Sequence, residues 1–302
     1  MTGDELYPHG HAVYLYCNGN ADGYSTPPGY ISLLVGEHDG EFPESKILRD
    51  TVGDSIAAKN PHYCELTGLY WIWKNAPRTK YVGLCHYRRF FWLANPSPRW
   101  GMKTVRPQDL PELIDASHIE ALMSGYDAIL PRPQFHAYSI EREYGLAHHL
   151  EDLHTCERII AERYPGMVSA MHRALNSNRL YYCNMFILPW DTFQAYMQWL
   201  FDVLFRAERE IRIDENDHYQ RRVFGFLAER LLNVYAEAQG WHIHELPLLF
   251  TGQPAQQWKN NWCYKLKKQQ RMLWGFQRWA DVKVIIKTYM PIIYKIYKRC
   301  RK

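Results

Sequence analysis

The stretch YVGLCHYRRFF, residues 81–91, decides the fold that we expect for this chain of 302 residues. Its first half, residues 81–85, consists of β-forming residues around one glycine, which permits close approach of a neighbouring backbone. This composition predicts a buried strand. Its second half, residues 86–89, places an imidazole, a phenol and two guanidinium groups in succession where that strand should end.

The segments on both sides of this stretch alternate between strand and helix patterns. Strands are predicted over residues 11–17, 30–36, 126–133, 181–188 and 241–250, and helices over residues 60–76, 138–165, 189–205 and 220–240. Alternation of this kind is typical of an α/β domain with a parallel or mixed sheet. In open α/β sheets, ligands bind outside the carboxyl ends of the strands, so we expect residues 86–89 to lie at a binding site.

Arg88 and Arg89 indicate a phosphorylated ligand. Two guanidinium groups at a strand end can form bidentate, charge-assisted hydrogen bonds to phosphate oxygens. The alternative is a structural ion pair with a helix acid such as Glu65. A buried cluster of two arginines and a histidine without an anion would be costly, which favours the phosphorylated ligand.

The cysteines and the N-terminal sequence indicate the compartment. The seven cysteines are scattered without a CxxC pair, which argues against a zinc site or a disulfide framework and fits a reducing, cytoplasmic setting. The N-terminal sequence lacks the basic and apolar regions of a signal peptide, and the chain has no run of about 18 apolar residues. We therefore expect neither export nor a membrane-spanning helix.

Charge is distributed unevenly along the chain. Residues 258–302 carry thirteen Lys and Arg and one acid, a net charge of +12, whereas the rest of the chain carries 23 bases and 31 acids, a net charge of −8. The basic residues of this tail alternate with Trp, Tyr, Leu and Ile, which is typical of a helix in a membrane interface, and Pro291 is expected to break or kink that helix. We expect a globular domain over residues 1–255 and a basic amphipathic helical tail over residues 256–302.

The partner predicted for this tail is an anionic membrane surface. An anionic inner leaflet attracts each nearby base by about 1 kcal/mol, so the protein is expected to be peripheral on the inner face of the cell membrane. Two alternatives stay open: a helix packed on its own domain with a solvated basic face, and a nucleic-acid patch. No nucleic-acid-binding motif supports the latter, and we predict no nucleic-acid partner.

Three motifs resemble those of a known family. The longest, LRDTVGDSIAAKNPHYCELTGLYWIWKN at residues 48–75, runs on into the stretch at residues 81–91, and NMFILPWDTFQAY at residues 184–196 and GFLAERL at residues 225–231 complete the set. Together they resemble the bacterial capsule and lipopolysaccharide glycosyltransferases that were first catalogued as a domain of unknown function. The resemblance extends over about residues 28–250.

This resemblance implies a GT-A fold, in which a Rossmann-type mixed sheet is flanked by helices. It also implies an inverting transfer of a hexose from a UDP-linked donor, with galactofuranose as the best candidate, onto a lipid-linked or growing capsule or O-antigen glycan. GT-A enzymes usually neutralise the diphosphate with an Asp-x-Asp motif and a divalent metal, and the corresponding place here is Cys-His-Tyr-Arg. We therefore predict that His86, Arg88 and Arg89 supply the positive charge, although Asp50 or Asp54 can still hold Mg²⁺ or Mn²⁺.

The candidate site residues lie mainly in these motifs. We assign donor binding to Asp50, Asp54, Asn60, Glu65, Lys74, His86, Tyr87, Arg88 and Arg89, and acceptor binding to Asn184, Arg222, His148 and Asp152. A carboxylate must take the proton of the acceptor hydroxyl, and Glu229 is preferred for this role over Asp54. Gly225 costs about 1 kcal/mol in its predicted helix, which indicates close packing by either a ligand or a neighbouring helix.

A second class of function also fits these observations. The chain can be a non-catalytic nucleotide-sugar or glycan-binding subunit of a membrane-associated polysaccharide assembly complex. Such a subunit would bind donor or glycan without turnover, whereas an enzyme would release UDP in the presence of acceptor. The sequence has no Gly-rich phosphate loop such as GxxxxGKS, which argues against a phosphotransferase.

Overall fold

The computed structural model is an α/β structure, as the sequence predicts, and it describes residues 10–17, 27, 29–37, 47–93, 102–106, 109–111, 113–114 and 116–251. The main sheet contains β1 (His11–Cys17), β2 (Ile31–Leu34), β3 (Leu48–Arg49), β4 (Tyr81–His86), β5 (Arg89–Phe91), β6 (Met102–Val105), β7 (Ala128–Pro131), β10 (Ile187–Pro189), β11 (Ile243–Leu246) and β12 (Leu248–Thr251). A small second sheet pairs β8 (Gln134–Phe135) with β9 (Arg179–Leu180).

The helices occupy the segments between the strands. They are α2 (Asn60–Tyr63), α3 (Leu66–Asn75), α4 (Ala116–Met123), α5 (Ile140–Ala147), α6 (Leu150–Arg163), α7 (Val168–Asn176), α8 (Trp190–Ala207) and α9 (Val223–Gln239). Within the residues that the structure describes, no helix is long and apolar enough to cross a membrane.

The sheet is mixed, and its central part is parallel. Its main order is β11-β7-β10-β4-β1-β2-β3, in which β4, β1, β2 and β3 run parallel and β10 runs antiparallel to both of its neighbours. Strand β5 turns back from β4 and pairs with β12, which also pairs with β6. The carboxyl ends of β1, β2 and β4 therefore lie at one edge of the sheet, where open α/β sheets bind ligands.

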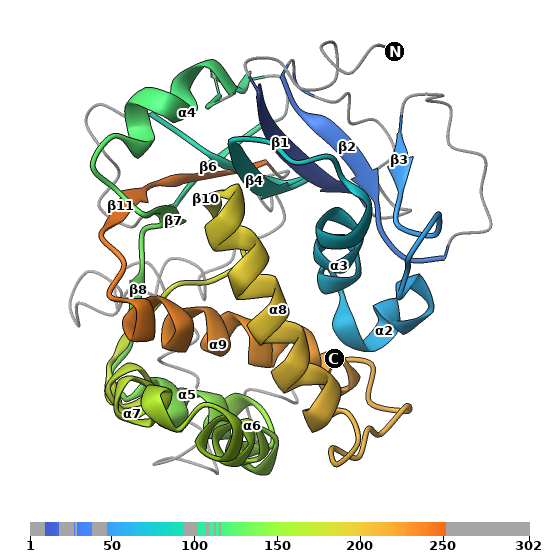
Figure 1. Ribbon diagram of the computed structural model, residues 1–302, viewed down its shortest axis with the longest axis vertical. Coiled ribbons are helices and arrows are strands. Elements are labelled where there is room, and N and C mark those ends of the chain that lie inside the picture. The colour runs from blue at the N-terminus through green and yellow to red at the C-terminus, as the bar shows by residue number, and fades with distance from the viewer. Residues whose placement is uncertain are drawn as a thin grey trace, which may run out of the picture.

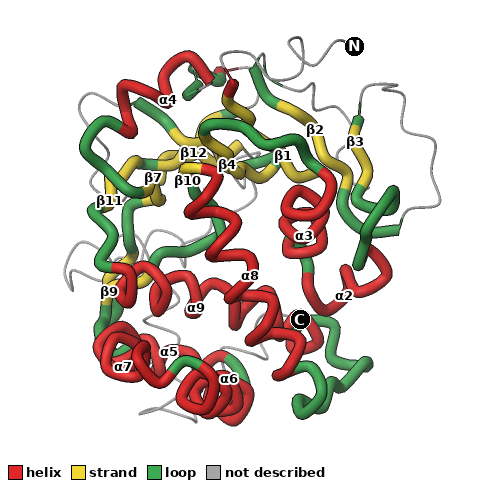
Figure 2. Tube along the Cα trace, viewed as in Figure 1, coloured by secondary structure: helices red, strands yellow, loops and turns green. Residues whose placement is uncertain are grey.

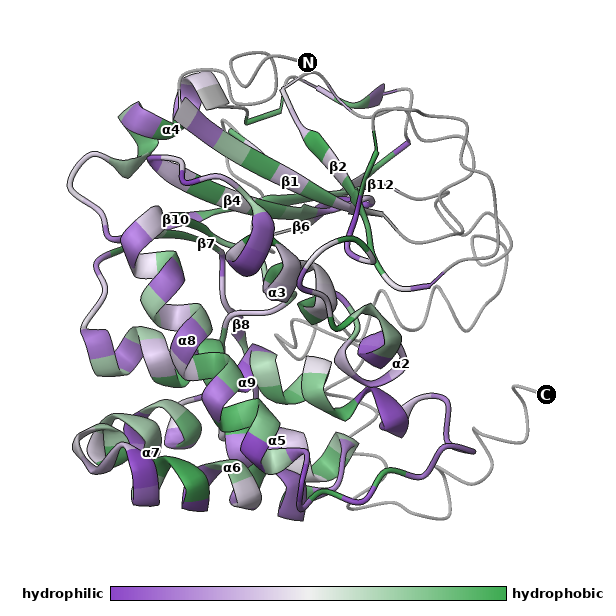
Figure 3. Ribbon diagram, turned by 45° about the vertical axis from the view of Figure 1, so that its right-hand side comes forward, coloured by the Kyte–Doolittle hydropathy of each residue, from purple (hydrophilic) through white to green (hydrophobic). Residues whose placement is uncertain are grey.

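Helices cover both faces of this sheet. Strand β1 is buried on both sides, because Ala12, Tyr14 and Tyr16 belong to one hydrophobic core while Val13 and Leu15 belong to the other. Helices α3, α8 and α9 lie on the first face and α4 on the second, and α5, α6 and α7 form a further layer outside α8 and α9 (Figures 1 and 2). Figure 3 shows green, hydrophobic residues along β1 and β4 and over much of α9. This packing holds the strand ends and the start of α9 in fixed positions.

The structure corrects two of the predicted elements. The helix predicted over residues 60–76 is broken into α2 and α3 at Cys64, whose φ is 54°. The Asn60 side-chain amide donates to the Cys64 carbonyl at 2.8 Å and to Thr67 Oγ1 at 3.1 Å, and so stabilises the break. The strand predicted over residues 241–250 is divided into β11 and β12 at Pro247, which has no N–H to continue a ladder.

Two further predicted elements also differ: of the strand predicted over residues 181–188 only residues 187 and 188 are in a strand, β10, because residues 183 and 184 form a turn with positive φ, and the helix predicted over residues 138–165 is divided into α5 and α6. The other predicted elements are confirmed to within a few residues. Gly83 in β4 is tightly packed as expected, because a Cβ there would lie 3.1 Å from Cγ1 of Ile187. The predicted tail, residues 256–302, and the boundary at residue 255 lie outside the described residues.

Candidate functional site

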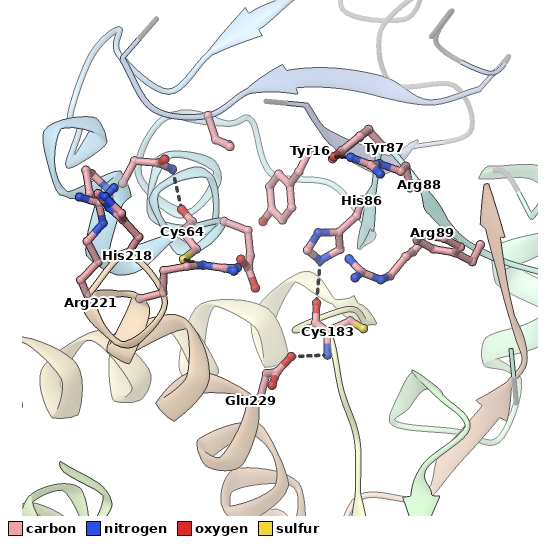
Figure 4. A pocket seen from close by; sticks show the side chains of 16 residues that line it. Tyr16, Cys64, His86, Tyr87, Arg88, Arg89, Cys183, His218, Arg221 and Glu229 are labelled. Atoms are coloured by element: carbon pink, nitrogen blue, oxygen red, sulfur yellow. Dashed lines mark hydrogen bonds between the residues drawn. The ribbon is translucent and has the colours of Figure 1, made fainter. Parts of the chain in front are cut away.

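A cavity of about 580 Å³ opens at the carboxyl ends of the parallel strands. Tyr16 near the end of β1, Val35 after β2 and His86 at the end of β4 all line it. Figure 4 shows Arg88 and Arg89 on one side of this cavity, His218 and Arg221 on the other, and Glu229 between the two sides. Residues 86–89 therefore line a cavity at the end of β4, and their role in ligand binding stays a prediction.

The hairpin between β4 and β5 presents the two predicted arginines. His86 pairs with Arg89 across a turn of two residues, Tyr87 and Arg88. The turn is fixed by backbone bonds, because the Tyr87 N–H donates to the Tyr16 carbonyl and the Arg88 carbonyl accepts from the Thr251 N–H, each at 2.9 Å. The Arg88 guanidinium donates to the Tyr87 hydroxyl and lies 4.6 Å from the centre of that ring.

Cationic side chains outnumber carboxylates in the lining of the cavity. Arg88, Arg89, Arg221 and Arg222 face two acids, Glu65 and Glu229. Within the described residues, Arg88 and Arg89 form no ion pair with Glu65 or another carboxylate, unlike the surface arginines that pair with acids elsewhere. The structural ion pair that the sequence left open is therefore not formed.

His86 is neutral in this setting. Its Nε2 lies 2.7 Å from the Cys183 carbonyl oxygen, which can only accept, so Nε2 carries the proton. Burial lowers the pKa of His86 below its usual value, and the nearby Glu65 carboxylate only partly opposes that shift. At neutral pH the charge predicted for His86 is consequently absent, and guanidinium groups alone make this wall positive.

Strained backbone is concentrated beside the cavity. Among the described residues, the non-glycine residues with positive φ are Cys64 at 54°, Cys183 at 77° and Asn184 at 47°. Cys64 and Cys183 line the cavity, and the buried Asn184 amide donates to Glu65 Oε1 at 2.8 Å and to the Gly225 carbonyl at 3.2 Å. Such conformations cost about 1–3 kcal/mol each and persist mainly where surrounding contacts impose them, often at functional sites.

Glu229 belongs to a buried network that fixes the Cys183 turn. Its Oε1 accepts from the Cys183 N–H at 2.9 Å, and its Oε2 accepts from Arg230 Nη1 at 3.0 Å. Arg230 is 2% exposed, and its Nη2 donates to Glu143 Oε2 at 2.6 Å. Burial raises the pKa of Glu229, although Arg230 and the Cys183 N–H act in the opposite direction.

Gly225 allows α9 to approach the break between α2 and α3. A Cβ at this position would lie 3.3 Å from Sγ and 3.4 Å from Cβ of Cys64. The close packing predicted from this glycine is therefore contact with a neighbouring element, and the alternative of a ligand against Gly225 is not needed. Arg222, just before α9, donates from Nε to the same Cys64 Sγ at 3.2 Å.

Several predicted donor residues lie outside the cavity lining. Asp50 is buried, and both of its carboxylate oxygens accept from the Gly36 N–H, at 2.9 and 3.1 Å. Asp54 is exposed and accepts from the Tyr70 hydroxyl at 3.0 Å. Lys74 lies over the Trp73 ring, 3.5 Å from its centre. Of the predicted donor set, the cavity contains Asn60, Glu65, His86, Tyr87, Arg88 and Arg89.

The predicted acceptor residues divide in the same way. Arg222 lines the cavity. Asn184 does not line it but donates a hydrogen bond to Glu65, which does, and Asp152 on α6 lies outside the lining. His148 stacks on Phe226 with ring centres 4.1 Å apart, and the exposed Tyr219 lies against both rings. Burial, followed by the charge of Arg230, lowers the pKa of His148 to about 4.

Other residues of the lining were not among the predicted site residues. Tyr16, His218 and Arg221 lie outside the motifs that carry the resemblance, and Cys183 directly precedes one of them. A strand end is the one signal that would have selected Tyr16 in advance. His218 and Arg221 reach the cavity through the packing of the segment before α9 against α2, and Cys183 reaches it through the turn before β10.

The lining does not fit a divalent metal ion. Hard cations prefer several carboxylate and carbonyl oxygens, but this cavity offers two carboxylates among four arginines, and both oxygens of Glu229 already accept hydrogen bonds. Among the described residues, the grouping that has metal-ligand spacing is Glu141, His154 and Glu157 on α5 and α6, and none of these three lines the cavity.

Comparisons with known proteins agree with this architecture. Residues 14–240 match the family described as Domain of unknown function (DUF4422), and the chain therefore belongs to that family. The solved apo structure of the bifunctional glycosyltransferase WbbM is similar, with 27% sequence identity and a TM-score of 0.68. That similarity covers 80% of this chain but only 45% of the WbbM chain. No curated protein sequence matches the chain.

Proposed function

We propose that this chain is a glycosyltransferase that moves a hexose from a UDP-linked donor to a glycan acceptor. The observation that carries the proposal is the cavity at the strand ends, which Arg88 and Arg89 line without a carboxylate partner among the residues that the structure describes. An anionic diphosphate would satisfy these guanidinium groups with charge-assisted, bidentate hydrogen bonds. The likeness to a bifunctional glycosyltransferase supports the same chemistry.

The arginines perform the task that a metal ion has in many sugar transferases. As the bond from the sugar to the diphosphate breaks, negative charge develops on the leaving phosphate, and preorganised positive groups stabilise it most. Arg88 and Arg89 are held for this purpose by the hairpin between β4 and β5. Reaction without a divalent metal follows from this assignment.

Acceptor binding is assigned to the opposite side of the cavity. Arg221, Arg222 and His218 line that side, and the guanidinium carbon of Arg222 lies 5.4 Å from the centre of the Phe226 ring, against which His148 and Tyr219 pack. A carboxylate of the cavity takes the proton of the acceptor hydroxyl. We retain from the sequence the proposals of an inverting transfer, a galactofuranose donor, a capsule or O-antigen glycan, and attachment to the inner membrane face through residues 258–302.

A donor panel tests this proposal. Purified chain is mixed with a synthetic or lipid-linked glycan acceptor and with UDP-galactofuranose, UDP-galactose, UDP-glucose or UDP-N-acetylglucosamine, and UDP release is measured. The proposal predicts acceptor-dependent release with one of these donors, with and without EDTA. Binding of UDP without turnover of any donor would instead support the non-catalytic binding subunit.

A further inference from the structure

The two carboxylates that line the cavity differ in the hydrogen bonds that they accept. Each oxygen of Glu229 already accepts a hydrogen bond: Oε1 accepts from the Cys183 N–H and Oε2 accepts from Arg230. Glu65 accepts one side-chain hydrogen bond, from the Asn184 amide to Oε1 at 2.8 Å, and within the described residues its Oε2 accepts none. Both carboxylates line the cavity, but of the two only Glu65 has an oxygen that accepts no hydrogen bond from the described residues.

Glu229 is the middle of a chain of hydrogen bonds that ends at the arginine hairpin. Glu143 accepts from Arg230, Arg230 donates to Glu229, and Glu229 accepts from the Cys183 N–H. The Cys183 carbonyl then accepts from His86, which is the last residue of β4 (Figure 4). This series of hydrogen bonds fixes the turn at Cys183, whose φ of 77° is strained. Removal of one residue of the series weakens the hydrogen bonds that the other residues make.

The position of Glu65 suits a group that contacts substrate. It follows the strained Cys64 and precedes α3, and the Asn184 amide fixes its Oε1. Tyr16 supports a ligand at this place, because its side chain is 2% exposed, lines the same cavity, and its hydroxyl has no hydrogen-bond partner among the described residues. An unpaired buried hydroxyl is costly, and a bound sugar hydroxyl or phosphate oxygen would satisfy it.

We propose that Glu65, and not Glu229, is the catalytic carboxylate of this cavity, and that Glu229 is a positioning residue for the Cys183 turn. This assignment rests on the proposed function. The acceptor hydroxyl gives its proton to Glu65 Oε2, and its oxygen forms a bond to the anomeric carbon of the donor sugar. The bond from that carbon to the diphosphate oxygen breaks, and its electron pair leaves on UDP, where Arg88 and Arg89 bind the new charge.

The test compares Glu65→Gln with Glu229→Gln in the full chain. With Glu65→Gln, kcat is expected to fall at least 100-fold, while UDP affinity stays within about threefold of wild type. Azide, an acceptor with no proton to lose, should form the glycosyl azide at a similar rate in wild type and in Glu65→Gln. With Glu229→Gln, we expect a lower melting temperature and a higher donor KM, while kcat at saturation falls less than about tenfold.

Three results would overturn the assignment. The first is turnover by Glu65→Gln within tenfold of wild type, and the second is a loss of azide transfer in Glu65→Gln that equals its loss of transfer to the glycan. The third is a 100-fold loss of kcat in Glu229→Gln at unchanged stability and UDP affinity. If Glu65→Gln does not fold, Glu65→Asp retracts the carboxylate and must still lower kcat at unchanged UDP affinity. Wild-type chain inactive with every donor would overturn the proposed function itself, whereas active wild type with active Glu65 variants overturns only this inference.

Discussion

Tyr219 is an exposed aromatic residue close to the cavity-lining Arg222, and it can offer a surface to the proposed acceptor. Its side chain is 54% exposed, and its ring centre lies 5.0 Å from that of Phe226. Aromatic faces attract the C–H groups of a sugar ring, and such a contact contributes about 1 kcal/mol. Tyr219→Ala is therefore expected to raise the acceptor KM about fivefold at unchanged UDP affinity. Tyr219→Phe is the control and should keep the wild-type KM, whereas weaker UDP binding in Tyr219→Ala would place this ring on the donor side instead.

His148 gives the stability of the fold a defined pH dependence. Because burial and Arg230 lower its pKa to about 4, the unfolded chain binds more protons than the folded chain between about pH 4 and pH 6.5. The stability from neutral His148 is complete above about pH 6.5 and is lost as the pH falls toward 4. His86, whose pKa is also lowered, adds an effect of the same sign. We expect His148→Gln to lower the melting temperature more at pH 7.5 than at pH 5, and an equal drop at both pH values would contradict this account.

Single residues differ in how far the sequence can predict their role. The position of Arg88 and Arg89 at the cavity was predictable, because a strand end is a local feature with a known geometric consequence. The neutral state of His86 was not, because it depends on burial against Cys183, which is 97 residues away. Asp54 is a carboxylate within a motif, as a catalytic base or metal ligand would be, yet its side chain accepts from the Tyr70 hydroxyl and does not line the cavity.

At the scale of elements, the contact of α9 with the break between α2 and α3 shapes one wall of the cavity. Gly225→Val would place side-chain carbon within 3.3 Å of the Cys64 Sγ and add a β-branched residue to a helix. Overpacking of this kind costs about 1–3 kcal/mol, so a clear drop in melting temperature is expected, together with weaker UDP binding. Gly166→Val, which meets open space, serves as the matched control. Equal stability of the two variants would contradict the packing described for this wall.

Strands and long helices were predictable from their periodicity, whereas the broken helix was not. The apolar spacing through residues 60–76 continues across Cys64 as if the helix were uninterrupted. The break depends on side-chain bonds from Asn60 and on the approach of Gly225, both of which appear only in the folded chain. Of the three residues before α9 that line the cavity, Arg221 and Arg222 lie within the helix predicted over residues 220–240, whereas His218 lies outside every predicted element.

For the whole molecule, the class of fold was predictable because strands and helices alternate along the sequence. The order of the strands was not, because the antiparallel insertion of β10 between β7 and β4 depends on long-range pairing. The cavity results from that order, since it places the ends of β1, β2 and β4 next to the start of α9. The donor and acceptor sides of the proposed site consequently come from segments that are far apart in sequence.

The uneven charge of the whole chain leads to a prediction about membranes. Residues 258–302 carry a net charge of +12, and anionic lipid contributes about 1 kcal/mol for each base near its surface. The full chain is expected to sediment with vesicles that contain 30% phosphatidylglycerol and to dissociate as salt rises to about 0.5 M. Vesicles of phosphatidylcholine alone are the control, and equal binding to both compositions would contradict an electrostatic attachment.

The central claim is that guanidinium groups, without a metal ion, bind the diphosphate of the donor. The most direct measurement is the UDP dissociation constant, with and without EDTA, of wild type, Arg88→Ala and Arg78→Ala, the last of which removes a surface arginine paired with Asp191. A hydrogen bond to a charged group contributes about 1.5–3 kcal/mol, so Arg88→Ala should weaken UDP binding about 10- to 100-fold, while EDTA and Arg78→Ala leave it unchanged. Loss of UDP binding in EDTA, with wild-type affinity in Arg88→Ala, would contradict the claim.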